Sequence, residues 1–276
     1  MYFDYYQLKE NPFNVTADPD FFFASACHAE AISSLVYGID QRKGILVISG
    51  EVGTGKTTLC RKLLFESLPN VKFAFILNPN FSEIELLQMI LADLGIRSRQ
   101  KTKSGLIHDL NKFLIKQSTK GNNIVLIIDE AQNLSVMQLE QIRLLSNLET
   151  EKEKLLQIVL VGQPELQEKL LLPELRQLRQ RICVHYKLDS LNRADVSHYI
   201  HHRILRAAIR DGIHSHPVFT DLAVDQIFHF TKGSPRTINI LCDRALLAGF
   251  AANKRSIDED IIQHCAKEVM YFEHNL

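Results

Sequence analysis

One stretch, residues 50–57, constrains this chain more than any other, because its sequence GEVGTGKT meets the pattern G-x-x-x-x-G-K-[ST] at every fixed position. Backbone N–H groups can wrap a phosphate only where the chain turns tightly and no Cβ intrudes, which explains the glycines. Lys56 would place its charge on the β- and γ-phosphates, and the Thr57 hydroxyl would complete the coordination of Mg²⁺. The predicted nucleotide-binding residues here are Gly50, Glu51, Val52, Gly53, Thr54, Gly55, Lys56, Thr57 and Thr58.

The residues on either side of this loop have the patterns of a strand and a helix. The apolar run 44–49 reads as a buried strand that leads into the loop. Residues 58–64 open a helix whose amino-terminal dipole would face the phosphates. This order of elements predicts a nucleoside triphosphate site and argues against a glycine-rich turn without a ligand.

Short apolar strands alternate with amphipathic helices between residues 44 and 190, which predicts an α/β core with a parallel sheet covered on both faces. The predicted strands are 45–49, 71–77, 124–129, 157–162 and 183–188, and the helices between them are 57–67, 82–94, 104–117, 135–147 and 164–180. Residues 1–43 precede this core as an aromatic segment with a helix at 28–37. Residues 191–276 are predicted to form a helical lid, with helices at 193–210, 221–230, 235–252 and 258–272 and a capped start of the last helix at 256–259.

The composition narrows the class of protein. The chain of 276 residues has a formal net charge of zero, so it has no global attraction to nucleic acid or to a membrane. No apolar run approaches the roughly 20 residues that a transmembrane helix needs, and the first residues lack the pattern of a signal peptide. Five cysteines are scattered without metal or disulfide spacing. These features predict a cytoplasmic protein.

Two adjacent acids, Asp129 and Glu130, end the predicted strand 124–129. Because parallel strands present ligand-binding groups at their carboxyl ends, we expect this pair beside the phosphate loop. Asp129 is predicted on the Mg²⁺ side, and Glu130 is predicted to orient or deprotonate the attacking water. The alternative is a solvated strand end. An acid at this position favours hydrolysis over phosphoryl transfer to a small molecule.

Two further groups are candidates for the same chemistry. Gln163 follows the strand 157–162, where its amide could hold the water or the γ-phosphate, although Pro164 also fits an ordinary helix start. Arg181 is the first choice, and Arg179 the second, for a guanidinium that reaches the γ-phosphate bound by a neighbouring subunit. The competing interpretation of these arginines is favourable charge at the carboxyl end of a helix.

Arg236 follows Gly233-Ser234-Pro235 on the first turn of a predicted lid helix, where it could fold over the nucleotide and sense the γ-phosphate. The alternative is an ordinary capped helix start. Alternating cations at 97–103 could meet an acidic partner or a nucleic acid backbone, but a solvated loop is the preferred interpretation.

With these residues in place, the chain resembles AAA+ ATPases, and specifically the family of general secretion pathway protein A. The resemblance covers nearly the whole chain and rests on the segments 11–13, 18–20, 25–31, 37–39, 50–58, 129–134, 144–149, 162–166, 178–181 and 233–236. The phosphate-loop pattern alone is generic, whereas this series in this order is specific.

The resemblance implies a P-loop NTPase (AAA+) fold, with a five-stranded parallel sheet in the order 5-1-4-3-2 and a C-terminal helical lid. It implies sensor roles for Gln163 and Arg236, and a trans-acting arginine near Arg181. Gln163 departs from the Asn, Ser or Thr that is common at the first sensor position. Pro12 and Phe13 would lie near the adenine, and the implied cofactors are ATP and Mg²⁺.

Proteins of this family couple a cytoplasmic ATPase to a membrane span and a periplasmic part, and help an outer-membrane secretin to assemble. The resemblance therefore implies a nucleotide-dependent homo-oligomer, a ring or a filament, with a secretion or export protein as partner. It also implies a cytoplasmic location, with a peripheral position at the inner membrane as a variant of it. The chain ends directly after the predicted lid, so we expect either the cytoplasmic part of such a protein or a stand-alone relative.

Two other functions are consistent with the same motifs. The first is a DNA-binding transposition regulator similar to MuB or TniB, against which the zero net charge counts. The second is a nucleotide switch with negligible hydrolysis, against which Glu130 counts.

Overall fold

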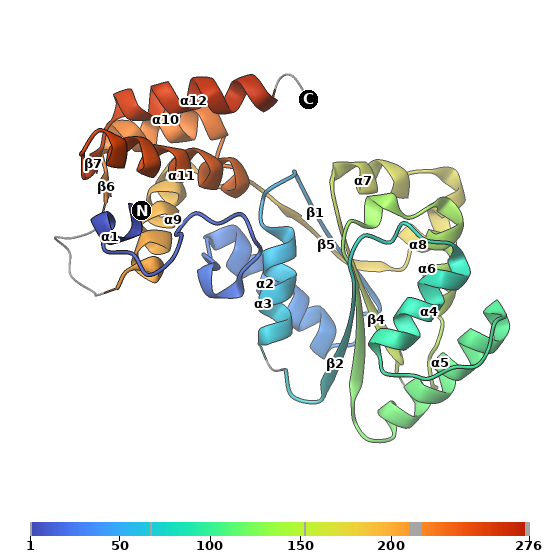
Figure 1. The fold of residues 1–276 in the computed structure, drawn as a ribbon. Coiled ribbons are helices and arrows are strands. Elements are labelled where there is room, and N and C mark those ends of the chain that lie inside the picture. Colours follow the sequence, from blue (N-terminus) through green and yellow to red (C-terminus); the bar gives the residue numbers. More distant parts are fainter. Residues whose placement is uncertain (1, 67, 152, 210–216, 274–276) are drawn as a thin grey trace. The chain divides into compact units, whose positions relative to one another are not determined.

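The computed structural model describes residues 2–66, 68–151, 153–209 and 217–273, and its ribbon is drawn in Figure 1. Its contacts divide the chain into two compact units. The sheet unit comprises Ala26–Glu51 and Leu59–Leu188, and the helical unit comprises Met1–Ser25, Val52–Thr58 and Asp189–Leu276. The segment 1–43, predicted as one region, is thus divided between the two units.

The sheet unit is built on five parallel strands in the order β2-β3-β4-β1-β5. They are β1 (Ile45–Gly50), β2 (Val71–Ile76), β3 (Asn123–Ile128), β4 (Leu156–Gly162) and β5 (Ile182–Leu188). Counted from β5, this is the predicted order 5-1-4-3-2, which is confirmed. The three central strands are buried along their whole length, as expected when both faces of a sheet are covered.

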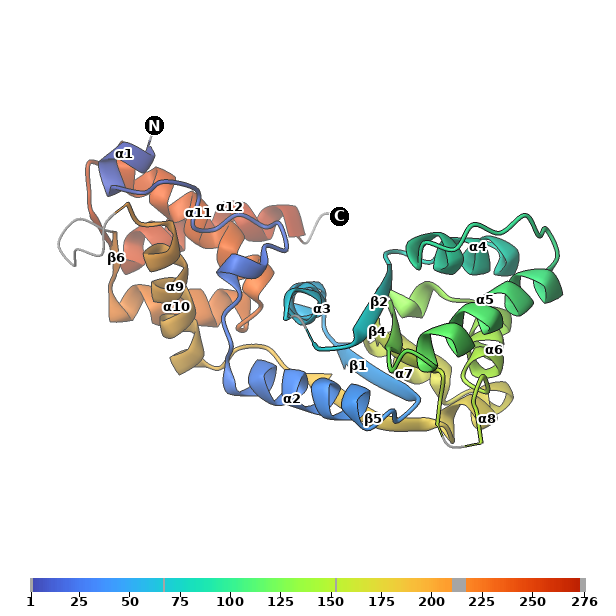
Figure 2. The same cartoon turned by 90° about the horizontal axis from the view of Figure 1, so that it is seen from below.

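Helices cover both faces of this sheet (Figure 1). One face carries α2 (Ala26–Asp40), which runs beside β5 (Figure 2), and α3 (Lys56–Phe65). The other face carries α4 (Glu83–Asp93), α5 (Lys103–Ser118), α6 (Val136–Leu145), α7 (Pro164–Leu170) and α8 (Arg176–Arg179). The larger apolar core lies on this second face, between the strands and these helices.

Capping boxes fix where α4 and α6 begin. The Ser82 hydroxyl accepts from the Glu85 N–H at 3.3 Å, and the Glu85 carboxylate accepts from the Ser82 N–H at 2.8 Å. Ser135 and Gln138 make the same reciprocal pair at 3.2 and 2.8 Å. Each box satisfies two N–H groups that lack a partner within the helix, so both helices start within one residue of the predicted positions.

One predicted helix of the sheet unit is interrupted. The segment 164–180 was predicted as continuous, but α7 ends at Leu170 and a 3-10 turn, Pro173–Leu175, comes before α8. The prediction is wrong because Pro173 has no backbone N–H to donate to the preceding turn of a helix. Its ring would also clash with the carbonyl groups of that turn.

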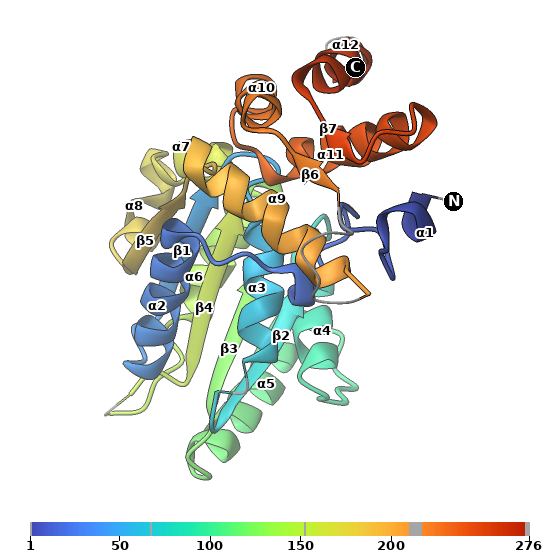
Figure 3. The same cartoon turned by 90° about the vertical axis from the view of Figure 1, so that its left-hand side faces the viewer.

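The helical unit contains α1 (Tyr2–Tyr6), α9 (Arg193–Ala207), α10 (Asp221–Thr231), α11 (Pro235–Ala251) and α12 (Glu259–Glu273), shown in Figure 3. Its core includes four residues of the N-terminal segment, Tyr6, Leu8, Phe13 and Phe21, which are buried together with residues of α9 to α12. The aromatic segment is therefore an integral part of this unit. No helix among the described residues is both long enough and apolar enough to cross a membrane.

A short parallel ladder, which was not predicted, precedes the last helix, and the capped start predicted within 256–259 is confirmed. Strand β7 (Ser256–Ile257) pairs with β6 (Val218–Phe219), so the capping residue is Asp258. α12 begins at Glu259, after Asp258, whose carboxylate accepts from the Ile261 N–H at 3.1 Å. Two-residue strands escape periodicity analysis because alternation needs a longer run. The helix predicted over 193–210 ends earlier, at Ala207, because Ala208 is extended and pairs with Leu8.

Arg203, on α9, fastens the N-terminal segment to the helical unit. It is only 5% exposed, and its guanidinium donates to the carbonyl groups of Pro12 and Asn14, the latter at 3.0 Å. It also donates to the Tyr199 hydroxyl at 3.0 Å and lies over the Phe21 ring at 4.8 Å from its centroid. These contacts offset the cost of burying a cation.

We expect Tyr6→Phe to lower the free energy of unfolding by about 1 kcal/mol. The Tyr6 hydroxyl bonds the carbonyl groups of Leu246 at 3.2 Å and Lys254 at 3.0 Å, and both would lose this donor. Burial raises the pKa of Tyr6 to about 12. The stability that depends on its neutral form is therefore complete below pH 10 and lost as the pH rises towards 12. Urea unfolding at pH 7 and pH 11 measures both effects.

Tyr5→Phe is the matched control, because Tyr5 uses its ring, edge-on to Phe250 at 5.4 Å, rather than those two carbonyl groups. Equal unfolding curves for Tyr6→Phe and Tyr5→Phe would contradict the role assigned to the Tyr6 hydroxyl.

Candidate nucleotide-binding site

Three neighbouring strands bring predicted site residues to one edge of the sheet. β4 lies between β3 and β1 and pairs in parallel with both. Gly50 ends β1 and leads into the phosphate loop, whereas Asp129 follows β3 and Gln163 follows β4. Because the strands are parallel neighbours in register, these three positions share the carboxyl edge, as expected for an α/β ligand site.

The phosphate loop connects β1 to α3. Gly53 and Gly55 have φ angles of 80° and 94°, which glycine adopts without steric cost. Lys56 is the first residue of α3 and is 6% exposed, and Thr54 is 1% exposed. The loop is therefore a tight turn that holds the lysine stem and begins a helix, the geometry on which phosphate binding at a helix amino terminus depends.

Gly53 packs against the amino-terminal end of α11 within the helical unit. The Arg236 N–H donates to the Gly53 carbonyl at 3.3 Å. A Cβ on Gly53 would lie 2.7 Å from the Arg236 Cβ and 2.8 Å from the Ser234 Oγ, so a side chain does not fit there. The Arg236 side chain is exposed on the first turn of α11. The phosphate loop and the predicted sensor arginine are thus joined through their backbones.

Asp129 and Glu130 adopt different backbone conformations. Asp129 is 1% exposed, and its Oδ1 accepts from the Glu130 N–H at 2.9 Å. Glu130 has φ 53° and ψ 39°, a left-handed conformation that is uncommon for a residue with a side chain. Such backbone strain is frequent at functional sites, and here it falls on the residue predicted to activate water.

Gln163 contacts Glu130 directly. Its Nε2 donates to the Glu130 Oε2 at 3.0 Å, and the Nε2 of Gln132 donates to the same oxygen at 2.5 Å. The Gln163 N–H in turn donates to the Oε1 of Gln132 at 3.1 Å. Sequence reasoning placed Gln163 near this site but assigned no role to Gln132. The signal available for Gln132 was its position two residues after Glu130 in one motif.

Arg181 lies at the amino ends of the parallel strands, opposite to the carboxyl ends where the phosphate loop starts. The register of β5 on β1 sets Ile182 beside Ile45 and Leu188 beside Gly50, so β5 begins where β1 begins. Arg181, the residue before β5, is therefore a full strand length, roughly 20 Å, from the edge where β1 enters the phosphate loop.

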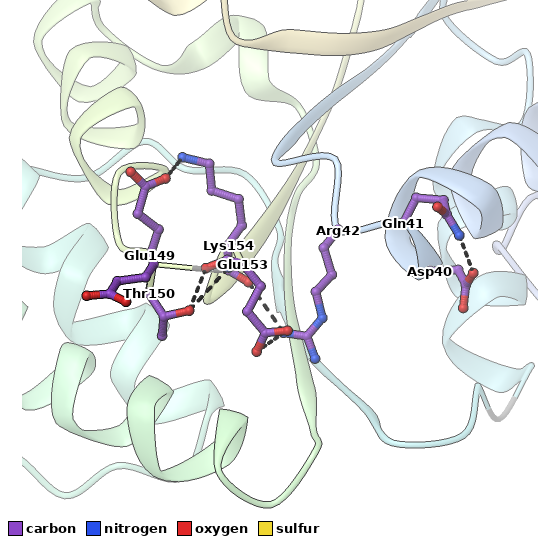
Figure 4. Close-up of a pocket in the computed structure, with 8 residues that line it drawn as sticks. Asp40, Gln41, Arg42, Glu149, Thr150, Glu153 and Lys154 are labelled. Carbon is purple, nitrogen blue, oxygen red and sulfur yellow. Dashed lines mark hydrogen bonds and ion pairs between the residues drawn. The ribbon is translucent and has the colours of Figure 1, made fainter.

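Paired charges fill the amino edge around Arg181. In the polar hollow of Figure 4, Arg42 bonds Glu153 at 3.0 Å and Lys154 bonds Glu149. A neighbouring hollow includes Arg181 together with Glu149 and Lys154. The hydrogen bond and charge of Lys154, with a smaller contribution from Arg181, lower the pKa of Glu149. Of the neighbouring arginines, Arg179, the second candidate, donates to the Leu170 carbonyl at 3.2 Å, and Arg176 is exposed.

Two other predicted regions have packing or surface roles in this structure. Phe13 is 2% exposed in the helical core, with its ring edge-on to Phe219 at 6.1 Å, and Pro12 offers its carbonyl to Arg203. Their contact with adenine stays a prediction.

The basic stretch 97–103 runs into α5. Its first three cations are exposed, and Ser98 between them donates to Asp109 at 2.7 Å. Lys103 pairs with Glu83.

The AAA domain family matches residues 39–170. The chain contains an AAA domain. The chain is also 40% identical over 270 residues to general secretion pathway protein A of Aeromonas hydrophila. This alignment covers 98% of the chain and 48% of the relative, so the chain spans about half the length of that protein. The resemblance inferred from the motifs is confirmed.

Several solved structures have the same fold as this chain. The ORC2 protein of Aeropyrum pernix matches with a TM-score of 0.66 and 18% identity over 94% of this chain and 72% of that one. Cdc6p of Pyrobaculum aerophilum matches with a TM-score of 0.68 and 18% identity over 91% and 71%. The RuvB branch migration motor of Thermotoga maritima matches with a TM-score of 0.55 and 18% identity over 92% and 72%. At these identities the likeness concerns the fold alone.

We expect Gly53→Ala to lower the affinity for ATP by about tenfold or more, because the methyl group must displace the loop from α11 or distort it. Gly95→Ala is the matched control, since Gly95 has a similar φ of 73° but open space around its Cβ position. Both variants carry backbone strain of about 1–2 kcal/mol, but only Gly53→Ala changes the loop. Titration with a fluorescent ATP analogue separates them, and equal affinities would contradict this account.

Proposed function

We propose that this chain is a Mg²⁺-dependent ATPase that works as an oligomer and energises the assembly of a bacterial secretion or export complex. The observation that carries the proposal is the contact of Glu130 with the Gln163 amide at the edge of the sheet from which the phosphate loop starts. A carboxylate held by an amide on the neighbouring strand suits the activation of water in NTP hydrolysis.

The residues divide the chemistry between them. The loop 50–57 holds the phosphates through its N–H groups, and Lys56 neutralises their charge. Glu130 accepts a proton from the attacking water or orients it, while Gln163 fixes the carboxylate of Glu130. Arg236 responds to the γ-phosphate from the first turn of α11, whose backbone already contacts the loop. Pro12 and Phe13 lie near the adenine.

Thr57 and Asp129 are the residues that would hold Mg²⁺. Their hydroxyl and carboxylate oxygens are the hard donors that this ion prefers. Bound there with ATP, the ion would neutralise charge that develops on the phosphate oxygens.

The position of Arg181 supports assembly into an oligomer. An arginine at the amino edge cannot reach phosphates held at the carboxyl edge of its own sheet, but it can reach those of an adjacent subunit. Arg181 therefore completes the site of a neighbour, and hydrolysis depends on nucleotide-dependent association into a ring or filament.

A similar protein supports the proposed biological setting. The 40% identity to general secretion pathway protein A supports a secretion or export protein as partner, and a cytoplasmic location that includes the inner-membrane surface. DNA is the alternative partner. The exposed cations of 97–101 are the observation that favours testing it, by adding duplex DNA to the ATPase assay at low and high salt.

We expect Lys56→Ala to abolish tight nucleotide binding, because the phosphates lose their closest positive charge.

Glu130→Gln should bind ATP with unchanged affinity and lose turnover by about 10²-fold or more, because the amide cannot accept the proton. Equilibrium binding and steady-state phosphate release measure the two effects. Wild-type turnover in Glu130→Gln would remove this residue from its assigned role.

We expect the specific ATPase activity of the wild type to rise with protein concentration, and that of Arg181→Ala to stay low and flat. The loss should approach 10³-fold, the lower end of the effect of a trans-acting arginine. The same measurement on Arg179→Ala and Arg176→Ala tests whether a neighbouring arginine has this role instead. A rate that is independent of concentration in every variant would show that each chain works alone.

A further inference from the structure

Gln132 joins the ends of β3 and β4 through a closed set of three hydrogen bonds. Its Nε2 donates to the Glu130 Oε2 at 2.5 Å, while its Oε1 accepts from the backbone N–H of Gln163 at 3.1 Å. The Gln163 side chain closes the set by donating to the same Glu130 oxygen at 3.0 Å. One side chain therefore contacts both residues that we place around the attacking water.

The surroundings of Gln132 hold its backbone and leave room for its amide. It lies in the 3-10 turn η2 (Ala131–Asn133), where Lys169 of α7 donates to the Gln132 carbonyl and, at 2.8 Å, to the Leu134 carbonyl. A Cβ at Gly162 would lie 2.9 Å from the Gln132 Oε1, so the amide packs closely against the end of β4. The position of Gln132 is thus fixed from three elements.

The two ends of the Gln132 amide do different work. Its NH₂ group donates to a carboxylate, a bond strengthened by the charge of the acceptor. Its carbonyl oxygen accepts from a backbone N–H and so fixes the start of α7, next to Gln163. Removal of the donor alone would leave the Glu130 Oε2 with the single amide bond from Gln163.

We propose that Gln132 is a positioning residue for ATP hydrolysis, which holds the Glu130 carboxylate and the Gln163 amide in one fixed arrangement around the water. The inference rests on the proposed function, because it requires Glu130 to activate that water. Both side-chain hydrogen bonds of Gln132 go to protein groups, the Glu130 carboxylate and the Gln163 N–H. Its loss should therefore reduce kcat and leave the affinity for ATP unchanged.

Two substitutions of similar length separate these effects. Gln132→Glu keeps an acceptor for the Gln163 N–H but places a second carboxylate against Glu130, and should lower kcat by on the order of 10²-fold. Gln132→Met removes both bonds without adding charge, and should lower kcat by about tenfold. The Kd for ATP should equal that of the wild type in both variants, which also shows that they are folded.

Asn122→Asp is the matched control. It makes the same change from amide to acid next to the opposite end of β3, where the Asn122 amide donates to the Gln117 Oε1 at 2.7 Å. This variant should retain the wild-type kcat.

Glu130→Gln, assayed in parallel, distinguishes two kinds of failure. If Glu130→Gln hydrolyses ATP like the wild type, the proposed function and this inference are both wrong. If Glu130→Gln stops turnover while both Gln132 variants keep the wild-type kcat, only the positioning role is wrong. Loss of ATP affinity in proportion to kcat, or a kcat raised by Gln132→Met, would also overturn it.

Discussion

Parallel pairing of β4 with both β3 and β1 is the constraint on which the candidate site depends. The three strands are distant in sequence, and the polar residues that follow them do not form a site unless the strands pair. Pairing them in parallel brings the start of the phosphate loop, the Asp129–Glu130 pair and Gln163 to the same edge. The three central strands are buried along their whole length, so close packing on both faces holds this register. The edge is therefore held by the core of the sheet unit.

The register of the strands also keeps Arg181 away from the candidate site of its own chain. Arg181 precedes β5, which starts level with β1, so this arginine is a strand length away from the site of its own chain. A sequence can show that arginines gather before a strand, but the edge they occupy follows from the direction of pairing. Close to Arg181, Lys154 pairs with Glu149.

The N-terminal segment shows where reasoning from local pattern ends. Its aromatic residues are evident in the sequence, but nothing local identifies the residues they pack against. Burial of Arg203 against the carbonyl groups of Pro12 and Asn14 decides that they belong to the helical unit. On a helix such as α9, an arginine reads as a surface residue, since arginines are seldom fully buried. Its role becomes visible only in the folded chain, where it bonds the carbonyl groups of Pro12 and Asn14, 191 and 189 residues earlier.

The sequence alone indicated most of the elements and the chemistry of individual positions, although it missed the break at Pro173 and the β6–β7 ladder. The loop 50–57 and the residues after β3 and β4 were predictable because glycine geometry and apolar periodicity are local signals, whereas the strand order was implied by the family resemblance. Only the tertiary structure decided what the side chains at those positions contact. Gln132 is the clearest case, since its bonds to Glu130 and Gln163 join the segments that follow two different strands. Hydrogen bonds between such segments depend on strand register and side-chain rotamer, and no single segment of the sequence records them.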